Sequence, residues 1–376
     1  MREIYADCAA TTPVYAQAIN EVNRIMSQVW GNPSSDHPMG EKAKAELERA
    51  RQSVAQSIDC KTNELYFTLG GSESNTWGIT KGVYANPTRK KIVVSKIEHP
   101  SVLNTCKYLS LQGFSVEYIP ASHDGKVLLS DIEKSVDENT ALLVLMHANN
   151  ETGMIQDIKE AAALAHARGA LVFCDCVQSV GHIPVSFSQI GADMISFSGH
   201  KFGAPKGIGG LVVSEKVKIE PLVFGGGQEK GLRGGTENLP YACAMARALK
   251  LSLAEDRQAL KNKRDALIDG LLAIDGATLN GTKENRLDSI VSVCFSGIIG
   301  QSAVMLLAQR GIYASSASAC SSSSQEPSHV LLAMGYSEDL ALSSVRFSIS
   351  PEITYDDIDY IIEKTSETVS LLRDNI

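Results

Sequence analysis

Short apolar runs alternate with helical patterns through the middle of the chain. Several runs have the continuous apolar character of buried strands, at residues 91–95, 141–146, 170–173 and 210–213. Residues 158–168 are rich in alanine and predict a helix that ends at Gly169. Earlier, one apolar stripe at helical spacing is formed by Leu47, Ala50, Val54 and Ile58. This alternation predicts a mostly parallel sheet covered by helices on both faces.

The pattern changes after about residue 255. A charged helix is predicted over residues 256–272, and alternating strand-like stretches follow at 290–295 and 344–349. A closing helix carries Ile358, Ile362, Val369 and Leu372 on one side. We therefore expect a second, smaller α+β domain.

Length, composition and charge narrow the class of protein. A chain of 376 residues can form more than one domain, and 44% apolar with 21% charged residues is ordinary for a soluble globular protein. There is no apolar run of the roughly 18 residues that span a bilayer and no signal-peptide pattern at the start, so we expect a cytoplasmic protein without a membrane partner. The net charge of −8 argues against nonspecific nucleic-acid binding.

The eight cysteines have no framework spacing, which favours free thiols over disulfides. Cys174 and Cys176 lie within an apolar run without a second ligand pair nearby. We interpret them as core residues rather than as a metal site, and we expect no metal.

Two strand-like runs end in groups that suit one cofactor chemistry. The first ends in Asp175, and the second ends in Ser198-Gly199-His200-Lys201 before a Gly/Pro stretch. An aldehyde cofactor on a nitrogen heterocycle needs a lysine for its Schiff base and a carboxylate that keeps the ring nitrogen protonated. Open α/β sheets bind ligands at the carboxyl ends of their strands. Alone, Lys201 would be a solvated charge and Asp175 a strand-end acid, so the joint pattern carries the prediction.

Two glycine-rich segments are candidates for binding a phosphate. Residues 68–75 predict a strand end, a turn at Gly70-Gly71 and a helix start with Ser72, where free N–H groups favour an anion. Taken alone, this segment is better explained as an ordinary capped helix. Residues 225–236 add a loop with Thr236 that can reach a phosphate or a neighbouring subunit. A dinucleotide fingerprint is missing, which disfavours an NAD enzyme.

Two further side chains are candidates for catalysis. His99 follows a strand-like run; a lone histidine is usually structural, but in a cofactor site it can stack on the ring and move protons. Cys320 lies in the serine-rich stretch 315–324, whose small polar residues predict an exposed, mobile surface segment. An accessible thiol that is partly thiolate can act as a nucleophile.

Together these segments resemble the cysteine desulfurases of the NifS/IscS type, fold-type I enzymes of the class V aminotransferase family that use pyridoxal phosphate. The resemblance covers nearly the whole chain, with matches at residues 7–13, 31–35, 98–99, 147–153, 178–181, 196–201, 318–321, 326–328 and 344–348. It implies an α/β fold with a mostly parallel seven-stranded sheet in a large domain, residues 13–255. A smaller α+β domain would comprise residues 1–12 and 256–376 and carry the catalytic cysteine loop.

The resemblance also implies roles in cofactor binding. Lys201 corresponds to the Schiff-base lysine, Asp175 to the partner of the ring nitrogen, and Gln178 to the partner of the phenolic oxygen, while His99 stacks on the ring. The phosphate ligands would come from Gly71, Ser72, Ser198, His200 and, across a homodimer interface, Thr236. Asn150 is expected to serve both the cofactor and the substrate.

On the substrate side, the resemblance implies that L-cysteine is converted to L-alanine and a persulfide on Cys320. Lys201 would take the Cα proton, and His99 is a candidate proton acceptor. Arg346 would clamp the substrate carboxylate, helped by Asn150 and Asn32. The sulfur would pass to an acceptor protein of iron–sulfur, tRNA-thiolation, DNA-modification or cofactor pathways, with no direct nucleic-acid partner.

Three alternatives remain open from the sequence. One is a related pyridoxal-phosphate lyase, such as a selenocysteine lyase, or a class V aminotransferase in which Cys320 is incidental. Another is a scaffold that holds the cofactor without turnover, against which the set of Lys201, Asp175, Arg346 and Cys320 argues. An NAD-dependent enzyme is the most distant.

Overall fold

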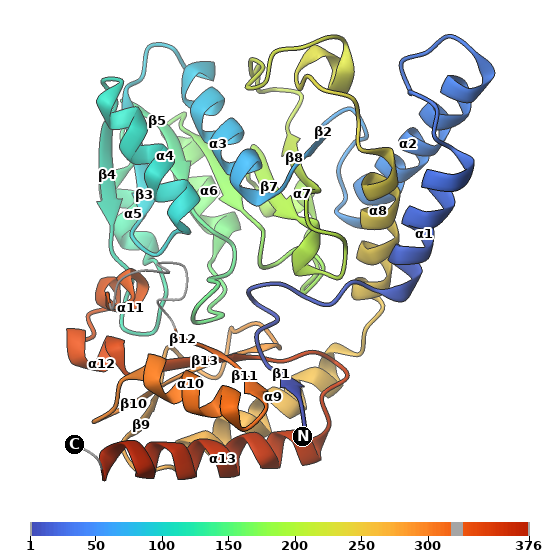
Figure 1. Ribbon diagram of the computed structural model, residues 1–376. Coiled ribbons are helices and arrows are strands. Elements are labelled where there is room, and N and C mark those ends of the chain that lie inside the picture. Colours follow the sequence, from blue (N-terminus) through green and yellow to red (C-terminus); the bar gives the residue numbers. More distant parts are fainter. Residues whose placement is uncertain (1, 317–325, 375–376) are drawn as a thin grey trace.

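A seven-stranded sheet forms the centre of the upper part of the molecule in Figure 1. The computed structural model describes residues 2–316 and 326–374. The strand order is β2 (Leu65–Thr68), β8 (Gly209–Val213), β7 (Met194–Ser198), β6 (Leu171–Asp175), β5 (Thr140–Val144), β3 (Lys91–Ser95) and β4 (Ser115–Ile119). Strands β7, β6, β5, β3 and β4 are parallel, and β8 is antiparallel to both of its neighbours. The predicted mostly parallel seven-stranded sheet is therefore confirmed.

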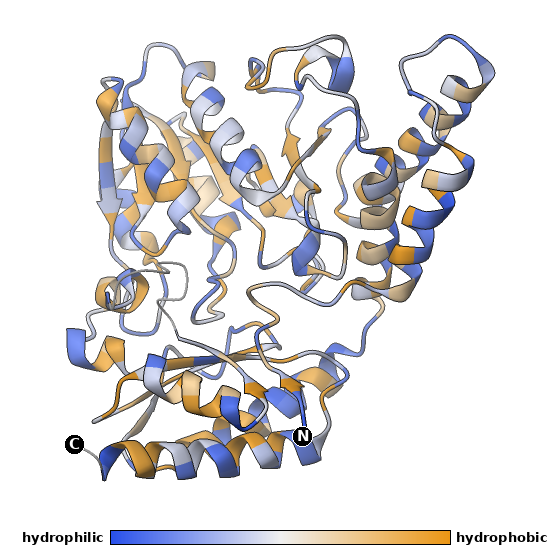
Figure 2. Ribbon diagram, viewed as in Figure 1, coloured by the Kyte–Doolittle hydropathy of each residue, from blue (hydrophilic) through white to orange (hydrophobic). Residues whose placement is uncertain are grey.

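Helices cover both faces of this sheet, which explains the continuous apolar strands. On one face, α3 (Gly71–Gly82) and α4 (Pro100–Leu111) pack over side chains such as Phe173 and Leu142. The other face is covered by α2 (Pro38–Ser57), α5 (Leu129–Ser135), α6 (Ile158–Ala167) and α8 (Leu239–Leu253), against which α1 (Ala16–Gln28) also packs. Because successive side chains of a strand point to opposite faces of the sheet, each inner strand contributes side chains to the hydrophobic layers on both faces. Figure 2 shows these strands as a largely hydrophobic band.

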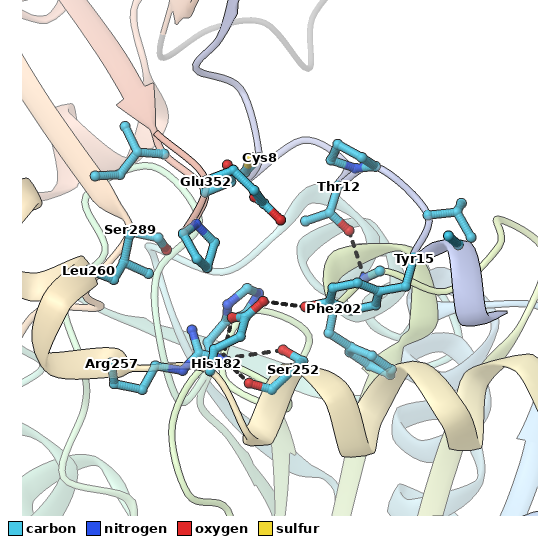
Figure 3. A pocket seen from close by; sticks show the side chains of 18 of the residues that line it. Cys8, Thr12, Tyr15, His182, Phe202, Ser252, Arg257, Leu260, Ser289 and Glu352 are labelled. Atoms are coloured by element: carbon cyan, nitrogen blue, oxygen red, sulfur yellow. Dashed lines mark hydrogen bonds and ion pairs between the residues drawn. The ribbon is translucent and has the colours of Figure 1, made fainter. Parts of the chain in front are cut away.

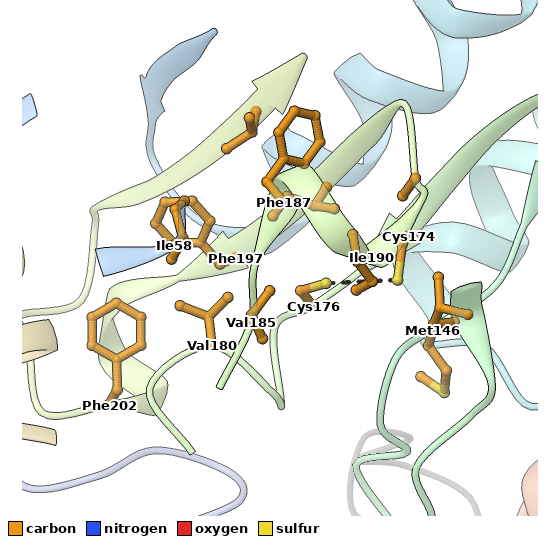
Figure 4. Packing of buried hydrophobic residues seen from close by; sticks show 14 of the residues in the cluster. Ile58, Met146, Cys174, Cys176, Val180, Val185, Phe187, Ile190, Phe197 and Phe202 are labelled. Carbon is orange, nitrogen blue, oxygen red and sulfur yellow. Dashed lines mark hydrogen bonds between the residues drawn. The ribbon is translucent and has the colours of Figure 1, made fainter. Parts of the chain in front are cut away.

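The sequence patterns correctly predicted where the helix α6 ends and which face of the helix α2 is buried. The alanine-rich helix α6 is followed by Gly169, whose φ of +73° is the left-handed conformation that favours glycine. The stripe in α2 buries Leu47, Ala50 and Val54. Cys174 and Cys176 are completely buried in the same core layer, with their sulfur atoms 3.6 Å apart (Figure 4). This burial agrees with their interpretation as core residues.

A second sheet with its own core lies in the lower part of Figure 1. Its antiparallel order is β12 (Ser315–Ser316), β13 (Ser344–Ser348), β10 (Ile290–Phe295) and β9 (Ala277–Leu279). The helices packed with it are α9 (Arg257–Leu272), α10 (Gly300–Gln309) and α13 (Tyr355–Arg373). The first residues of the chain join this part, since β1 (Ile4–Tyr5) pairs with β11 (Ile312–Tyr313).

The serine-rich stretch differs from its prediction at its beginning. Ser315 and Ser316 form β12, and Ser315 is buried beside Arg346 of β13. The prediction of an exposed segment is wrong for these two residues, because backbone pairing to β13 overrides their polar character. Cys320 and the rest of residues 317–325 lie outside the described residues. The described residues continue at residue 326 and form two short helices, α11 (His329–Ala333) and α12 (Glu338–Leu342). Among the described helices, none combines the length and apolar character that a membrane crossing requires.

Candidate active site

One cavity brings together most of the predicted site residues. It has a volume of about 380 Å³ and lies at the carboxyl ends of β6 and β7, where segments of both sheets meet. Ten predicted residues line it: Gly71, Ser72, His99, Asn150, Asp175, Gln178, Ser198, His200, Lys201 and Arg346. Their convergence from widely separated segments makes this cavity the candidate active site.

Lys201 lies in the tight turn that follows β7. Its Nζ donates to the backbone carbonyls of Ala9 and Ala10, at 2.6 and 2.9 Å. The segment that supplies these carbonyls is itself fixed, because the N–H of Thr12 donates to the carbonyl of His200 at 2.9 Å. The N-terminal segment therefore holds the lysine at the wall of the cavity.

Asp175 ends β6 and is 4% exposed. Its Oδ1 accepts from the N–H of Val177 at 2.9 Å, and its Oδ2 accepts from Asn75 Nδ2 at 2.7 Å. Gln178 lies just beyond, and its Nε2 donates to the carbonyl of Ala9 at 2.9 Å. The strand end thus presents a carboxylate whose two oxygens are both oriented by donors.

His99 caps the N-terminus of α4. Its Nδ1 lies 2.8 Å from Ser101 Oγ and 3.1 Å from the N–H of Ser101. Burial lowers the pKa of His99; Asp175 opposes this shift and Lys201 adds to it. The ring is therefore neutral at physiological pH.

The start of α3 forms a cradle for an anion. The first N–H groups of a helix have no acceptor within the helix, and α3 begins at Gly71 on the cavity wall. A Cβ on Gly71 would lie 2.8 Å from Val177 Cγ2, so the close approach needs glycine. Ser198 and His200 face the same cavity; burial, with Lys201 and Lys206, lowers the pKa of His200 to about 4.

This donor set fits pyridoxal phosphate. The cradle at Gly71 and Ser72 suits a phosphate, Asp175 suits a protonated ring nitrogen, and Lys201 suits the aldehyde. The neutral ring of His99 offers a flat surface in the same cavity on which the cofactor ring can stack. All these groups border one cavity, so one molecule can contact them together.

Arg346 enters the cavity from the middle of β13 and is 5% exposed. Its Nη1 donates to the carbonyl of Asn150 and its Nη2 to Asp7 Oδ1, each at 2.8 Å. Its buried Nε has no hydrogen-bond partner within residues 2–316 and 326–374. Hydrogen bonds from Nη1 and Nη2 fix the guanidinium, and the N–H on Nε is not used by the described residues. This arrangement suits a substrate carboxylate.

Three predicted residues are not among those that line the cavity. Asn32 lies in the turn before α2, where its Oδ1 accepts from the N–H of Ser34 at 2.9 Å. Thr236 follows the glycine-rich loop that leads to α8. Cys320 lies outside the described residues. The roles assigned to these three residues remain predictions.

Several contacts in the site had no assignment from the sequence. Asn75 and Ser101 connect Asp175 to His99, Asp7 pairs with Arg346, and the carbonyls of Ala9 and Ala10 hold Lys201. Asn75 and Asp7 both lie in segments singled out from the sequence, and their polar side chains were the available signal. Backbone carbonyls carry no such signal, because every residue has one.

Glu98, next to His99, is completely buried. Its Oε1 accepts from Ser95 Oγ at 2.6 Å and from the N–H of Met146 at 2.7 Å, while its Oε2 has no partner in the described part of the chain. Burial raises the pKa of Glu98 to about 8, although the Ser95 hydrogen bond opposes the shift. Glu98 is therefore largely protonated at neutral pH.

A second cavity of about 430 Å³ lies behind the N-terminal segment (Figure 3). His182 on its wall lies with Nε2 2.8 Å from the carbonyl of Lys201, and burial lowers its pKa to about 4. His182 is thus neutral and donates from Nε2 to the backbone of the lysine. Cys8 lines this second cavity, and burial raises the pKa of its thiol to about 12. Neither Cys8 nor Cys176 lines the candidate active site.

Comparison with known proteins agrees with this geometry. Residues 4–361 match the model of the family described as aminotransferase class-V. Cysteine desulfurase IscS of Methanosarcina thermophila is 40% identical, over 99% of this chain and 93% of the relative. The IscS protein of Dictyoglomus turgidum is 38% identical, over 99% and 96%.

Solved structures give the same result. A NifS-like protein has a TM-score of 0.92 at 36% identity, over 99% of this chain and 100% of the other. The structure described as SspA in complex with cysteine has a TM-score of 0.82 at 31% identity, over 93% and 100%. With the full-length relatives and the shared fold, this chain belongs to the class-V aminotransferase family, among its cysteine desulfurases of the NifS/IscS type.

Proposed function

We propose that the cavity between β7 and β13 is the catalytic centre of this cysteine desulfurase. The enzyme uses pyridoxal phosphate and converts L-cysteine to L-alanine and an enzyme-bound persulfide. The observation that carries the assignment is the meeting of Lys201, Asp175 and Arg346 at one cavity. Lysine and aspartate suit the cofactor, and arginine suits the carboxylate of an amino acid.

Residues from five segments of the chain would hold the cofactor. Asp175 would bind the ring nitrogen, Gln178 would bind the phenolic oxygen, and His99 would cover the ring, while Gly71, Ser72, Ser198 and His200 would bind the phosphate. Asn150 would contact both the cofactor and the substrate. When bound, pyridoxal phosphate supplies the electron sink for the reaction.

The substrate is held and deprotonated by two side chains from opposite walls. Arg346 binds the carboxylate of L-cysteine with a planar fork, because the contacts to Asn150 and Asp7 fix the guanidinium plane. Asn32 assists this carboxylate. Lys201 would take the Cα proton on Nζ. Its carbonyl partners at Ala9 and Ala10 stabilise the protonated amine.

Cys320 accepts the sulfur. Its thiolate attacks the sulfur of the substrate; an S–S bond forms, the Cβ–S bond breaks, and the carbon fragment takes up protons and leaves as alanine. The persulfide on Cys320 then passes its terminal sulfur to a thiol of an acceptor protein.

We further propose a cytoplasmic homodimer in which Thr236 of each chain reaches the phosphate site of its neighbour. The seven cysteines in the described residues are all free thiols, which supports a reducing compartment. The large domain comprises residues 13–255, and the small domain comprises residues 1–12 and 256–376. A hydrophobic core drawn only from residues 4–6 and 260–369 supports this division, while Cys294 and residues 330–341 pack into the core of the large domain.

Replacing Cys320 by serine tests the nucleophile. The variant is expected to bind L-cysteine, which is seen as a change in the visible absorbance of the bound cofactor. Its rate of alanine formation is expected to fall by about 100-fold or more. Cys60→Ser, at a partly buried thiol outside the cavity, is the control and keeps full activity. Unchanged alanine formation by Cys320→Ser would favour a related lyase in which Cys320 is incidental.

A further inference from the structure

Asn75 occupies a central position between the two sides of the cofactor site. It lies in the first turns of α3 and is 1% exposed. Its Nδ2 is 2.7 Å from Asp175 Oδ2 and 2.9 Å from Ser101 Oγ. Its Oδ1 is 2.5 Å from Ser196 Oγ. One buried amide therefore contacts residues of β6, α4 and β7.

The chemistry of these partners fixes the orientation of the amide. An ionised carboxylate only accepts hydrogen bonds, so the Asn75 atom facing Asp175 is the nitrogen. The second N–H on this nitrogen then donates to Ser101 Oγ, and the Ser196 hydroxyl donates to Oδ1. All three hydrogen bonds that this amide makes to these partners are consistent with a single arrangement.

The same donor and acceptor rules determine which ring nitrogen of His99 carries the proton. A backbone N–H can only donate, so the N–H of Ser101, 3.1 Å away, requires His99 Nδ1 to accept. Ser101 Oγ accepts from Asn75, and its own proton is therefore directed to His99 Nδ1 at 2.8 Å. Both donors leave Nδ1 unprotonated, and the proton of the neutral ring lies on Nε2.

The geometry points to Asn75 as a positioning residue that holds the Asp175 carboxylate and, through Ser101, keeps His99 in the tautomer with its proton on Nε2. In this state His99 offers the cavity a proton donor rather than a lone pair. Its part in the reaction is therefore to donate from Nε2, in place of the proton-acceptor role expected from the family resemblance. This inference rests on the proposed function for the identity of the ligand, but the tautomer is a property of the chain.

The test is nitrogen-15 NMR of the holoenzyme labelled at histidine, with the His99 signals assigned by comparison with His99→Gln. Wild-type protein is expected to show Nδ1 as the unprotonated nitrogen of His99. In Ser101→Ala the hydroxyl donor to Nδ1 is removed, and in Asn75→Ala that hydroxyl is no longer oriented by the amide. Only the longer backbone contact of 3.1 Å then favours the Nε2-protonated form, so the Nδ1-protonated tautomer becomes detectable. Asn104→Ala, an exposed asparagine on α4, is the matched control and keeps the wild-type signals.

The affinity for the cofactor distinguishes the contact of Asn75 with Asp175 from its contact with His99 through Ser101. Asn75→Ala is expected to raise the dissociation constant of pyridoxal phosphate about tenfold, because Asp175 loses a charge-assisted hydrogen bond worth about 1.5 kcal/mol. Ser101→Ala leaves the Asn75–Asp175 contact in place and keeps the wild-type affinity. Ser101→Ala also serves as the readout if Asn75→Ala does not fold.

A wild-type His99 protonated on Nδ1, or an unchanged tautomer in both variants, would overturn the inference. Failure of the wild-type enzyme to release alanine from L-cysteine would instead count against the proposed function. The tautomer is measured without turnover, so the two failures are distinguishable.

Discussion

Arg346 Nη2 lies 2.8 Å from Asp7 Oδ1, so the guanidinium on β13 is held by a carboxylate from the opposite end of the sequence. The second terminal nitrogen donates to Asn150. These contacts set the plane of the guanidinium before a substrate enters. A pre-organised fork loses less entropy on binding a carboxylate than a flexible amine does.

Arg346→Lys is therefore expected to raise KM for L-cysteine by about tenfold or more, because an ammonium cannot reproduce the fork that binds a carboxylate. Steady-state kinetics with alanine detection gives the value. Arg49→Lys serves as the control, since Arg49 is an exposed arginine paired only to Glu46 in the described residues. An unchanged KM in Arg346→Lys would remove Arg346 from the substrate site.

Ser72 and Ser198 are predicted to recognise the phosphate rather than the ring. Ser72→Ala and Ser198→Ala are each expected to weaken pyridoxal phosphate binding about tenfold, the cost of one hydrogen bond to a charged group. Binding of pyridoxal, which lacks the phosphate, remains unchanged. Ser110→Ala, at an exposed serine of α4, affects neither. Equal weakening of both ligands would place these serines elsewhere in the site.

Glu98 predicts a specific dependence of stability on pH. Burial raises its pKa from 4.5 to about 8, so between these values the native state binds a proton that the unfolded state releases. Its contribution to stability is complete below about pH 4.5 and is lost as the pH rises through about 8. Glu98→Gln keeps an uncharged group there at every pH.

The unfolding temperatures of the wild type and Glu98→Gln, measured from pH 5 to 9, check this prediction. The difference, variant minus wild type, is expected to increase with pH. Glu133→Gln, which changes an exposed glutamate on α5, controls for a general change in net charge. A difference that stays constant over this range would show that Glu98 is ionised in the native protein throughout.

Ser328 is predicted to contribute more stability than an ordinary helix cap. It caps α11 by accepting from the N–H of Leu331, and its Oγ also donates to the buried Glu151 at 2.5 Å. Ser328→Ala is expected to cost about 2–3 kcal/mol, because a buried carboxyl loses its donor as well. Ser337→Ala, which removes the exposed cap of α12, is the matched control at about 1 kcal/mol. Equal losses in denaturant unfolding would contradict a role for the Glu151 contact.

The main elements of the site were predictable because they follow from residue type and strand position. Asp175 ends one buried strand and Lys201 closely follows the next, and parallel neighbours present their carboxyl ends at one edge of the sheet. Arg346 could be assigned only through the family resemblance, since nothing in its local pattern indicates which wall of a cavity it reaches. The serine-rich stretch was mispredicted at Ser315 and Ser316, because strand pairing depends on a partner far along the sequence.

The connecting network could not be predicted. The three partners of Asn75 come from separate segments, and no spacing along the chain relates them. The protonation sites of His99 and His182 depend on which donors and carbonyls lie within hydrogen-bond distance. These features follow from packing in three dimensions.

The most direct test of the account is mass spectrometry of the holoenzyme after a single turnover with L-cysteine. We predict one added sulfur atom on the peptide that contains Cys320, in an amount equal to the alanine released, and none on the peptides of Cys8 or Cys176. Lys201→Ala is the control and gives neither product. Alanine release without added sulfur on Cys320 would contradict the proposed mechanism.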